Sequence, residues 1–321
     1  MRLPPGIFAY VWRTSGSHQV GLLVLSVAGF LLAIAPLELQ RRIVNGALGK
    51  QDFDAVLLLC LAYGGLGLVA GGFKLALNVY RGWVGEATVR KLRASVYQQA
   101  IISRLRDGDR LEKQGEVLAV VVAEVEPVGG FAGVATSEPI LQGGVMLSLF
   151  VYMLVLQPWI AALSFLLFAT QLLFVPPMQA AVTRRALTRI QTVREISIDM
   201  IDDGTGTDSA ARATFRRKIT EVFRLNMQIL YYKYAMNFLM NLTNHLGITG
   251  VLAVGGWYVV RGEVDVGTIV AFISGLSRLN DPWGDLVNYF REYTVASGKY
   301  ALIREIFEAP ADREGELQVA T

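Results

Sequence analysis

The feature that most constrains this chain is a run, residues 139–183, that contains no Asp, Glu, Lys or Arg. A helix needs about 20 apolar residues to cross the hydrocarbon core of a bilayer, so the run is about twice as long as one span requires. It must therefore hold two membrane spans, which are divided at Gln157-Pro158-Trp159.

Four further apolar segments predict the remaining spans. Three of them contain no charged residue and lie at 20–37, 55–73 and 234–260. The last, at 266–277, is short because Arg278 interrupts it. Hydropathy thus gives five firm spans and one weak one. The composition, with 53% hydrophobic and only 18% charged residues, is likewise too apolar for an ordinary soluble domain.

Residues that commonly carry enzyme chemistry are scarce. The lone cysteine, Cys60, lies in an apolar run, so no disulfide can form within the chain and we interpret it as a packing residue. Two histidines, His18 and His245, cannot build a metal site alone. No P-loop motif occurs, and the glycine pattern at 65–70 lies inside an apolar span. We therefore expect no catalytic, metal or cofactor site in this chain, and no nucleic-acid partner.

The distribution of basic residues sets the expected orientation. Residues 90–113 carry seven Lys or Arg and residues 184–224 carry nine, whereas the short turns after the third and fifth spans carry none and one. By the positive-inside rule, the two long connections and both termini are expected in the cytoplasm, most simply at a bacterial inner (plasma) membrane. Arg41, Arg42 and Lys50 oppose this topology, because it places them outside.

Helical periodicity continues beyond two of the spans. After the apolar part of the second segment, apolar residues recur at Val89, Leu92, Val96 and Ala100. A helix over residues 53–103 would be on the order of 75 Å long, against a hydrocarbon core of roughly 30 Å, so it must project into the cytoplasm. The fourth segment continues in the same way through Ile190, Val193, Ile196 and Met200.

Apolar residues also fall at helical spacing before the first span, at Ile7, Phe8, Val11 and Trp12. They stand beside basic residues, which suits a short helix lying in the cytoplasmic membrane interface. We interpret residues 4–16 as such an elbow helix, with a frayed tail as the alternative.

The most specific local pattern is GGWYVVRGEVDVGTIVAFISGLSRLNDP at residues 255–282. Gly262 is placed to end one helix and Asp265 to cap the next, so the segment predicts a helical hairpin with a short polar turn. This hairpin resembles the last two membrane helices of the type I ABC exporter transmembrane domain. The resemblance covers roughly residues 4–310.

The resemblance implies an all-α membrane protein of six long transmembrane helices that extend into the cytoplasm, assembled as a domain-swapped dimer. It implies a transmembrane domain over residues 1–309 and, at 310–321, a tail or truncated linker toward a nucleotide-binding domain. The six expected spans are 17–45, 53–103, 115–156, 159–203, 209–260 and 266–308.

Two non-periodic polar stretches, 104–114 and 204–212, lie at the tips of the expected cytoplasmic hairpins. In the family these positions form coupling helices that dock onto the ATPase domain. The match is better at the first tip, where the residues from Gln114 to Val117 follow the family's Thr-Gly-Glu turn, and plain solvated turns are the alternative. The residues that the resemblance assigns to coupling are Arg104, Arg106, Asp107, Asp109, Arg110, Gly204, Thr207, Asp208 and Ser209.

Polar residues at helical spacing within the spans predict a polar pathway. A charge that faces lipid at mid-bilayer costs at least about 2.5 to 3.5 kcal/mol, so such residues must face a cavity, an ion-pair partner or another subunit. The candidate cavity residues are Asn237, Asn241, Asn244 and His245 of the fifth helix, Arg278, Asp281 and Asp285 of the sixth, and Glu138 and Gln142 of the third. The sixth-helix stripe continues through Asn288 and Glu292.

Two alternatives apply to these stripes. Interhelical hydrogen bonds, or an ion pair of Arg278 with Asp281 or Asp285, could simply hold the helices together. A solvated face is the second alternative for the later residues of the sixth helix.

These patterns favour the permease subunit of an ABC exporter, which moves a substrate outward by alternating access. The implied partners are a second transmembrane subunit in a homo- or heterodimer, membrane lipids, and a nucleotide-binding ATPase domain or subunit that supplies ATP and Mg. Two other functions stay open. One is a proton-driven carrier on the same fold, with Glu138, His245 or Asp281 as the protonated group, and the other is a non-transporting membrane scaffold. The sequence does not identify the substrate.

Overall fold

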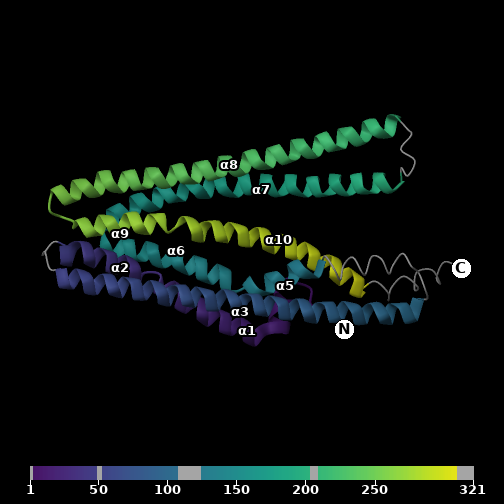
Figure 1. Cartoon of the computed structure of the whole chain (residues 1–321), viewed down its shortest axis with the longest axis horizontal. Coiled ribbons are helices and arrows are strands. Elements are labelled where there is room, and N and C mark those ends of the chain that lie inside the picture. The colour runs from purple at the N-terminus through teal and green to yellow at the C-terminus, as the bar shows by residue number, and fades with distance from the viewer. Residues whose placement is uncertain (1–2, 49–52, 108–123, 203–208, 309–321) are drawn as a thin grey trace. The chain divides into compact units, whose positions relative to one another are not determined.

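The computed structural model describes residues 3–48, 53–107, 124–202 and 209–308, and in these ranges all regular structure is helical (Figure 1). The predicted all-α class with six long helical stretches is confirmed. The elements are α1 (Ile7–Leu32), α2 (Ala35–Arg42), the π-helix η1 (Ile43–Leu48), α3 (Phe53–Asp107), α5 (Val125–Val134), α6 (Ser137–Leu156), α7 (Pro158–Asp202), α8 (Ser209–Val260), α9 (Val266–Ser277) and α10 (Asn280–Glu308).

Five stretches of the described chain are long and apolar enough to cross a membrane. They are Ile7–Gly46, Phe53–Gln98, Val125–Leu156, Pro158–Ser197 and Ala213–Val260. The helix α9 has only 12 residues and is not among these five stretches, which agrees with the expectation of five firm spans and a short, weak sixth one.

The chain divides into two compact units. The first unit consists of Met1–Tyr152 and Asp281–Thr321 and contains α1, α2, α3, α5, most of α6, and α10. The second unit, Met153–Asn280, contains α7, α8 and α9.

The core of the first unit lies where α1, α3, α5 and α10 meet. Each helix contributes a fully buried aliphatic side chain, namely Val11, Leu92, Val128 and Ile303. Full burial of such a side chain contributes about 1.5 to 3 kcal/mol. This core therefore fixes the N-terminal part of α1 against the distal half of α3.

The helix α1 is interrupted at Ser15, whose φ of −140° and ψ of 26° are not helical. The Ser15 hydroxyl donates to the Val11 carbonyl at 2.9 Å. The interruption lies near the end of the expected elbow helix, 4–16, and separates its helical residues 7–14 from the rest of α1. Phe8 and Trp12 are 40% and 46% exposed on this segment, although the Phe8 ring also packs on Phe131 of the core, at 5.7 Å between ring centroids.

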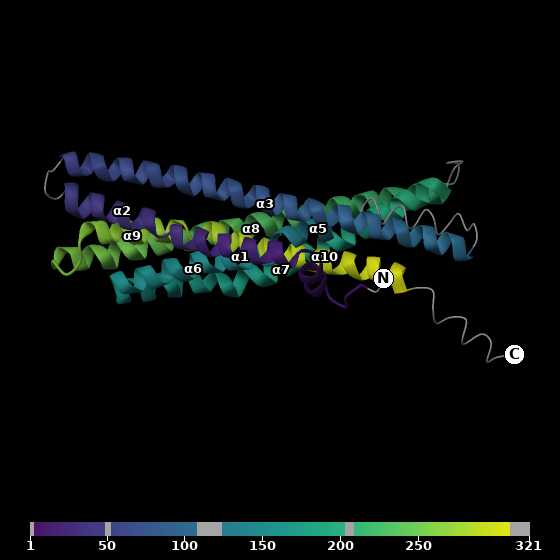
Figure 2. The same cartoon turned by 90° about the horizontal axis from the view of Figure 1, so that it is seen from below.

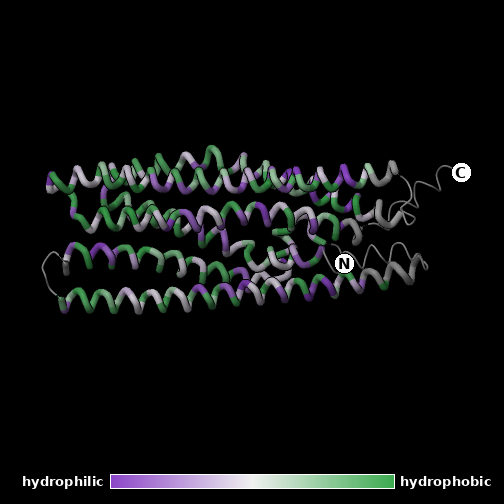
Figure 3. Tube along the Cα trace, turned by 45° about the horizontal axis from the view of Figure 1, so that its top comes forward, coloured by the Kyte–Doolittle hydropathy of each residue, from purple (hydrophilic) through white to green (hydrophobic). Residues whose placement is uncertain are grey.

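The helix α3 is continuous over 55 residues, or about 80 Å at 1.5 Å per residue. It runs through Arg104 to Asp107, past its expected end near residue 103. The half that follows Phe53 is mainly hydrophobic, and the half toward Asp107 carries more hydrophilic residues (Figure 3). Figure 2 shows α2 beside α3, and the Gln40 amide donates to the Tyr63 hydroxyl between them at 3.1 Å.

The third expected span, 115–156, is not one continuous helix in its described part, because α5 ends at Val134 and α6 begins at Ser137. Pro139 explains the interruption, since proline has no N–H to donate to the carbonyl four residues earlier, that of Ala135. The Tyr289 hydroxyl donates to this carbonyl instead, at 2.8 Å.

The sixth expected span is likewise two helices, α9 and α10, separated by a turn at Arg278 and Leu279. Pro282 stands four residues after Arg278 and cannot donate to its carbonyl. The expected sixth span, 266–308, is therefore divided between these two helices.

The helices α3 and α5 approach each other most closely at glycines. A Cβ atom on Gly133 would overlap the backbone carbonyl of Arg81, and one on Gly129 would overlap Val89. Small residues four positions apart allow this kind of approach between helices. The backbone of Arg81 consequently lies against α5 directly before the interruption.

In the second unit, α7 and α8 form a long antiparallel pair (Figure 1). Three polar contacts cross the pair, from Arg185 Nε to Gln228 Oε1 at 3.0 Å, from Arg189 Nη1 to Asn226 Oδ1 at 3.2 Å, and from Lys218 Nζ to Glu195 Oε2 at 3.3 Å. The Arg185 guanidinium also lies 4.4 Å from the ring centroid of Tyr232, which adds a cation–π contact.

The turn between α8 and α9 has the expected glycine, since Gly262 has a φ of +75°. Asp265 occupies the N-cap position of α9, but its side chain makes no capping hydrogen bond, so the predicted side-chain cap is wrong. The Asp265 backbone carbonyl accepts from the Thr268 N–H at 3.0 Å instead. The Arg261 guanidinium lies 3.8 Å from the ring centroid of Trp257 and closes the turn from outside.

Candidate functional site

A cluster of polar side chains from α3, α6 and α10 lies in the first unit, with a buried ion pair at its centre and the exposed Asp285 at its edge. At its centre, Arg81 Nη1 and Glu138 Oε2 are 2.5 Å apart. The side chains of Arg81 and Glu138 are only 10% and 15% exposed. A buried ion pair of this kind depends on both partners, because a single charge left behind would be uncompensated.

Gln142 extends this pair to α10. Its Nε2 donates to Glu138 Oε1 at 2.8 Å and to Asp285 Oδ2 at 2.9 Å. A glutamine amide has two N–H donors, and here both point at carboxylates. Four side chains from three helices thus form one network, which we call the Arg81 cluster: Arg81, Glu138, Gln142 and Asp285.

The Arg81 cluster holds two carboxylates and one guanidinium. Arg81 Nε and Nη2 are buried and have no hydrogen-bond partner among the described residues. Buried N–H donors are costly to leave unpaired. The guanidinium can therefore donate further hydrogen bonds, whether to Asp285, to water or to a polar group that enters the cluster.

A cavity of about 330 Å³ lies further along α10 in the same unit. It is lined by Pro127, Gly130 and Phe131 of α5 and by Arg291, Glu292 and Val295 of α10. Glu292 follows Asp285 by seven residues, or two helical turns, so both side chains lie on one face of α10. The face that carries Asp285 therefore leads to the cavity.

Glu292 lies in α10, outside the five candidate spans. Partial burial raises the pKa of its carboxyl above the ordinary value, which Arg291 opposes and the negative charges of Glu138 and Asp285 reinforce. Its carboxylate has no ion-pair partner in the part of the chain that the structure describes.

Three of the predicted cavity residues, Glu138, Gln142 and Asp285, thus lie together. Sequence reasoning missed Arg81. The available signal was its position, because Arg81 stands between the apolar segment at 55–73 and the periodic apolar residues that begin at Val89. A charge in such a place requires a partner.

The other predicted cavity residues do not join the Arg81 cluster. On α8, in the second unit, Asn237, Asn241 and His245 are exposed and Asn244 is half-buried. Arg278 is half-buried at the C-cap of α9, and Asp281 is exposed in the first turn of α10. Their role in lining a cavity stays a prediction.

The predicted coupling residues lie largely outside the described residues. The backbones of Arg104, Arg106 and Asp107 belong to α3, and that of Ser209 begins α8. Asp109, Arg110, Gly204, Thr207 and Asp208 fall outside the described ranges altogether.

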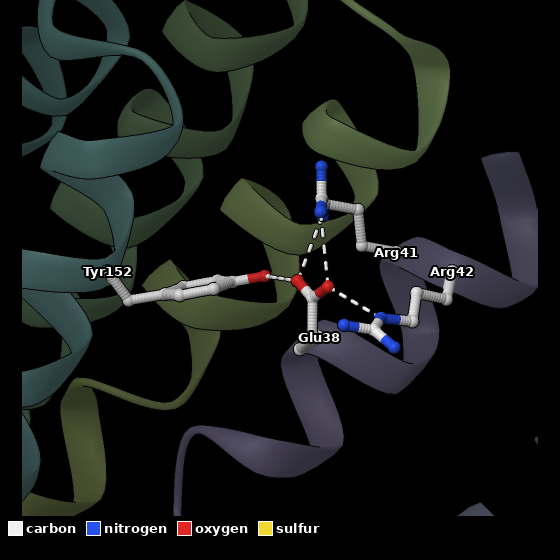
Figure 4. A network of polar contacts seen from close by, with 4 residues as sticks. All are labelled: Glu38, Arg41, Arg42 and Tyr152. Atoms are coloured by element: carbon white, nitrogen blue, oxygen red, sulfur yellow. Dashed lines mark hydrogen bonds and ion pairs between the residues drawn. The ribbon is translucent and has the colours of Figure 1, made fainter.

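A second polar network surrounds Glu38 of α2 (Figure 4). Its carboxylate accepts from Arg41 Nε at 2.9 Å, from Arg41 Nη2 at 3.1 Å and from Arg42 Nε at 2.7 Å. The hydroxyl of Tyr152 in α6 donates to the same carboxylate at 2.8 Å. Arg41 and Arg42, which oppose the charge-based topology, therefore share one carboxylate and carry less net charge than their number suggests.

Comparison with known proteins places these features in a family. The family of ABC transporter transmembrane regions matches residues 20–194, which is more than half of the chain. An uncharacterized ABC transporter ATP-binding protein, YfiC of Bacillus subtilis (strain 168), is 21% identical over 327 aligned residues. The alignment covers 97% of this chain and 52% of YfiC, so the chain spans about half the length of this relative. With its long apolar helices, the chain is an integral membrane protein that belongs to the family of ABC transporter transmembrane regions.

Proposed function

We propose that the chain is the permease subunit of an ABC exporter and moves its substrate outward by alternating access. The observation that supports this most is the Arg81 cluster, since a buried ion pair, an amide and the exposed Asp285 carboxylate meet on three helices of an ABC transporter membrane domain. Polar groups inside apolar helices are expensive and mark substrate pathways.

Energy for transport would come from a nucleotide-binding ATPase, either a separate subunit or another domain. The name of YfiC, an ATP-binding protein about twice as long as the aligned region, supports this arrangement. The two long hairpin tips at 104–114 and 204–212 would contact this ATPase. A second transmembrane subunit would complete the pathway, in a homo- or heterodimer with exchanged helices.

The orientation follows from the basic residues. The distal half of α3 and the paired α7 and α8 carry most of the Lys and Arg and would lie in the cytoplasm with both termini. Pairing with Glu38 lowers the net positive charge of the first outer turn, so Arg41 and Arg42 count less against this topology.

The α8 stripe would line the same pathway. On α8, Asn241 and Phe238 are both exposed, but they differ in chemistry. A spin label at Asn241→Cys, in a Cys60→Ser background, should be accessible to water-soluble nickel, and a label at Phe238→Cys should be accessible to oxygen dissolved in lipid. Equal lipid exposure at both positions would contradict cavity lining by Asn241.

The transport mechanism is tested with the chain purified together with the proteins encoded beside its gene and reconstituted in liposomes. We expect vanadate-sensitive ATP hydrolysis and an ATP-dependent change in water accessibility at Asn241→Cys. A change driven by a proton gradient without ATP would identify the proton-driven carrier instead. If neither response is observed, the result supports the scaffold function.

A further inference from the structure

The interruption between α5 and α6 frees backbone carbonyls that need new donors. A helix end leaves four carbonyls without intrahelical partners, and Pro139 supplies no N–H for the carbonyl of Ala135. Three carbonyls at this place accept from side chains: Ala132 from Gln19 Nε2 at 2.8 Å, Gly133 from the Ser137 hydroxyl at 3.3 Å, and Ala135 from the Tyr289 hydroxyl at 2.8 Å.

Gln19 of α1 connects both sides of the interruption. Its side chain is fully buried, and its Oε1 accepts from the Thr136 hydroxyl at 2.6 Å while its Nε2 donates to Ala132. The same Nε2 donates to the Ser15 hydroxyl at 3.2 Å. One amide therefore ties the interruption of α1 to the interruption between α5 and α6.

Tyr289 of α10 holds the interruption from the opposite helix. Its ring centroid lies 5.7 Å from that of Phe131, and its side chain is buried apart from 6% of its surface. Tyr289 follows Asp285 by four residues, so one face of α10 contacts both the Arg81 cluster and the interruption. A displacement of α10 would act on both at once.

The angle at the interruption decides where Glu138 lies. Gly133, just before it, rests against the backbone carbonyl of Arg81, and Glu138, just after it, pairs with the Arg81 side chain. A change in the angle would move Glu138 relative to Arg81 while the Gly133 contact stays in place.

We propose that Gln19 and Tyr289 form a latch that fixes the angle between α5 and α6 and so positions Glu138 on Arg81. Movement of α10 withdraws the Tyr289 hydroxyl and lets the angle change, which exposes the buried charges of Arg81 and Glu138. The part of the latch in transport rests on the proposed function, whereas its effect on the helix angle does not. Gln19 and Tyr289 are positioning residues, because they act through Glu138.

The angle is measured between spin labels at Glu126→Cys of α5 and Leu147→Cys of α6 in the full chain. Both positions are exposed, and replacement of the lone cysteine by Cys60→Ser leaves no other label site. A continuous helix would place the two Cα atoms roughly 30 Å apart at 1.5 Å per residue, within the range of pulsed electron resonance. We expect a narrow distance distribution in the parent protein.

Tyr289→Phe removes one oxygen and should shift or broaden this distribution. Tyr293→Phe is the matched control, because Tyr293 lies one turn further on α10, also contacts Phe131, and has no hydrogen bond to its hydroxyl among the described residues. Gln19→Leu should act more strongly than Tyr289→Phe. Distributions for Tyr289→Phe that superimpose on the parent distribution would overturn the latch, and this variant decides the matter even where Gln19→Leu does not fold.

A double-mutant cycle separates positioning from general packing. If Tyr289 positions Glu138, the effects of Tyr289→Phe and Glu138→Gln on the distance distribution are not additive, whereas independent packing effects add. Additive effects would overturn the positioning role. A shifted distribution in a protein without ATP-driven movement would contradict the exporter and leave the latch intact.

Discussion

The Arg81 guanidinium meets the Glu138 carboxylate at 2.5 Å, and the backbone carbonyl of Arg81 contacts Gly133 of α5, which stands five residues before Glu138 in the sequence. A buried charge pair and the closest approach of two helices therefore fall at one level of the first unit. The helices can come this close only because Gly133 has no side chain. The ion pair is thus held by backbone packing as well as by charge.

Removal of one partner of this pair should be costly. Arg81→Leu leaves Glu138 with 15% side-chain exposure and no guanidinium, and loss of one partner of a buried pair typically costs about 3 to 5 kcal/mol. The double variant Arg81→Leu/Glu138→Gln should recover much of this loss. Denaturant unfolding in detergent measures both, and a double variant no more stable than Arg81→Leu would contradict the pairing.

A methyl group at the helix contact should also destabilise the first unit. Gly133→Ala places a Cβ atom against the Arg81 carbonyl, and overpacking of this kind costs typically about 1 to 3 kcal/mol. Gly130→Ala is the matched control on the same helix, because a Cβ atom there meets nothing within 4 Å. Equal melting temperatures for the two variants would show that α3 and α5 are not in close contact.

Loss of the Glu38 carboxylate should weaken the contact of α2 with α6. Glu38→Gln leaves Arg41 and Arg42 as adjacent like charges, and we expect a loss of roughly 1 kcal/mol, since these side chains stay partly exposed and solvent screens them. Tyr152→Phe should lose less, because it removes one neutral donor. Asp54→Asn, at an exposed position in the first turn of α3, is the control that should leave the unfolding transition unchanged.

Stability should fall as Glu292 ionises. Its pKa is raised in the folded chain, mainly by burial, so its contribution is most favourable below its unfolded pKa and is lost as the pH rises through the folded pKa. Glu292→Gln should therefore be more stable than the parent above that pKa and should show a flatter pH dependence. Unfolding midpoints from pH 4 to 7 measure this, with Glu126→Gln on the surface of α5 as the control. A parent unfolding midpoint that rises with pH more steeply than the midpoint of Glu292→Gln would contradict a raised pKa for Glu292.

Much of the fold follows from the sequence because membrane spans depend on local composition. The charge-free run at 139–183 forms nearly all of α6 and the first part of α7, and the hairpin turn has Gly262 where a positive φ is needed. The long extension of α3 followed from its apolar periodicity. Each of these features is decided by residues that are close together in the sequence.

The features that sequence reasoning missed depend on contacts between distant segments. Pro139 and Pro282 indicate the interruptions in the third and sixth spans. A hydropathy average does not detect them, because it does not depend on whether one backbone N–H is missing. Arg81 forms its ion pair only in the folded chain, where α6 places Glu138 beside it from a position far along the sequence. Gln19 likewise becomes a binding partner of Ala132 and Thr136 only in the folded unit.

The paired helices α7 and α8 are joined to each other by polar contacts. Polar contacts of Arg185 and Arg189, and a third between Lys218 and Glu195, oppose sliding of the two helices past each other. Two rods joined so that they cannot slide resist bending far more than two separate rods. Such cross-links favour movement of α7 and α8 as a pair over movement of either helix alone.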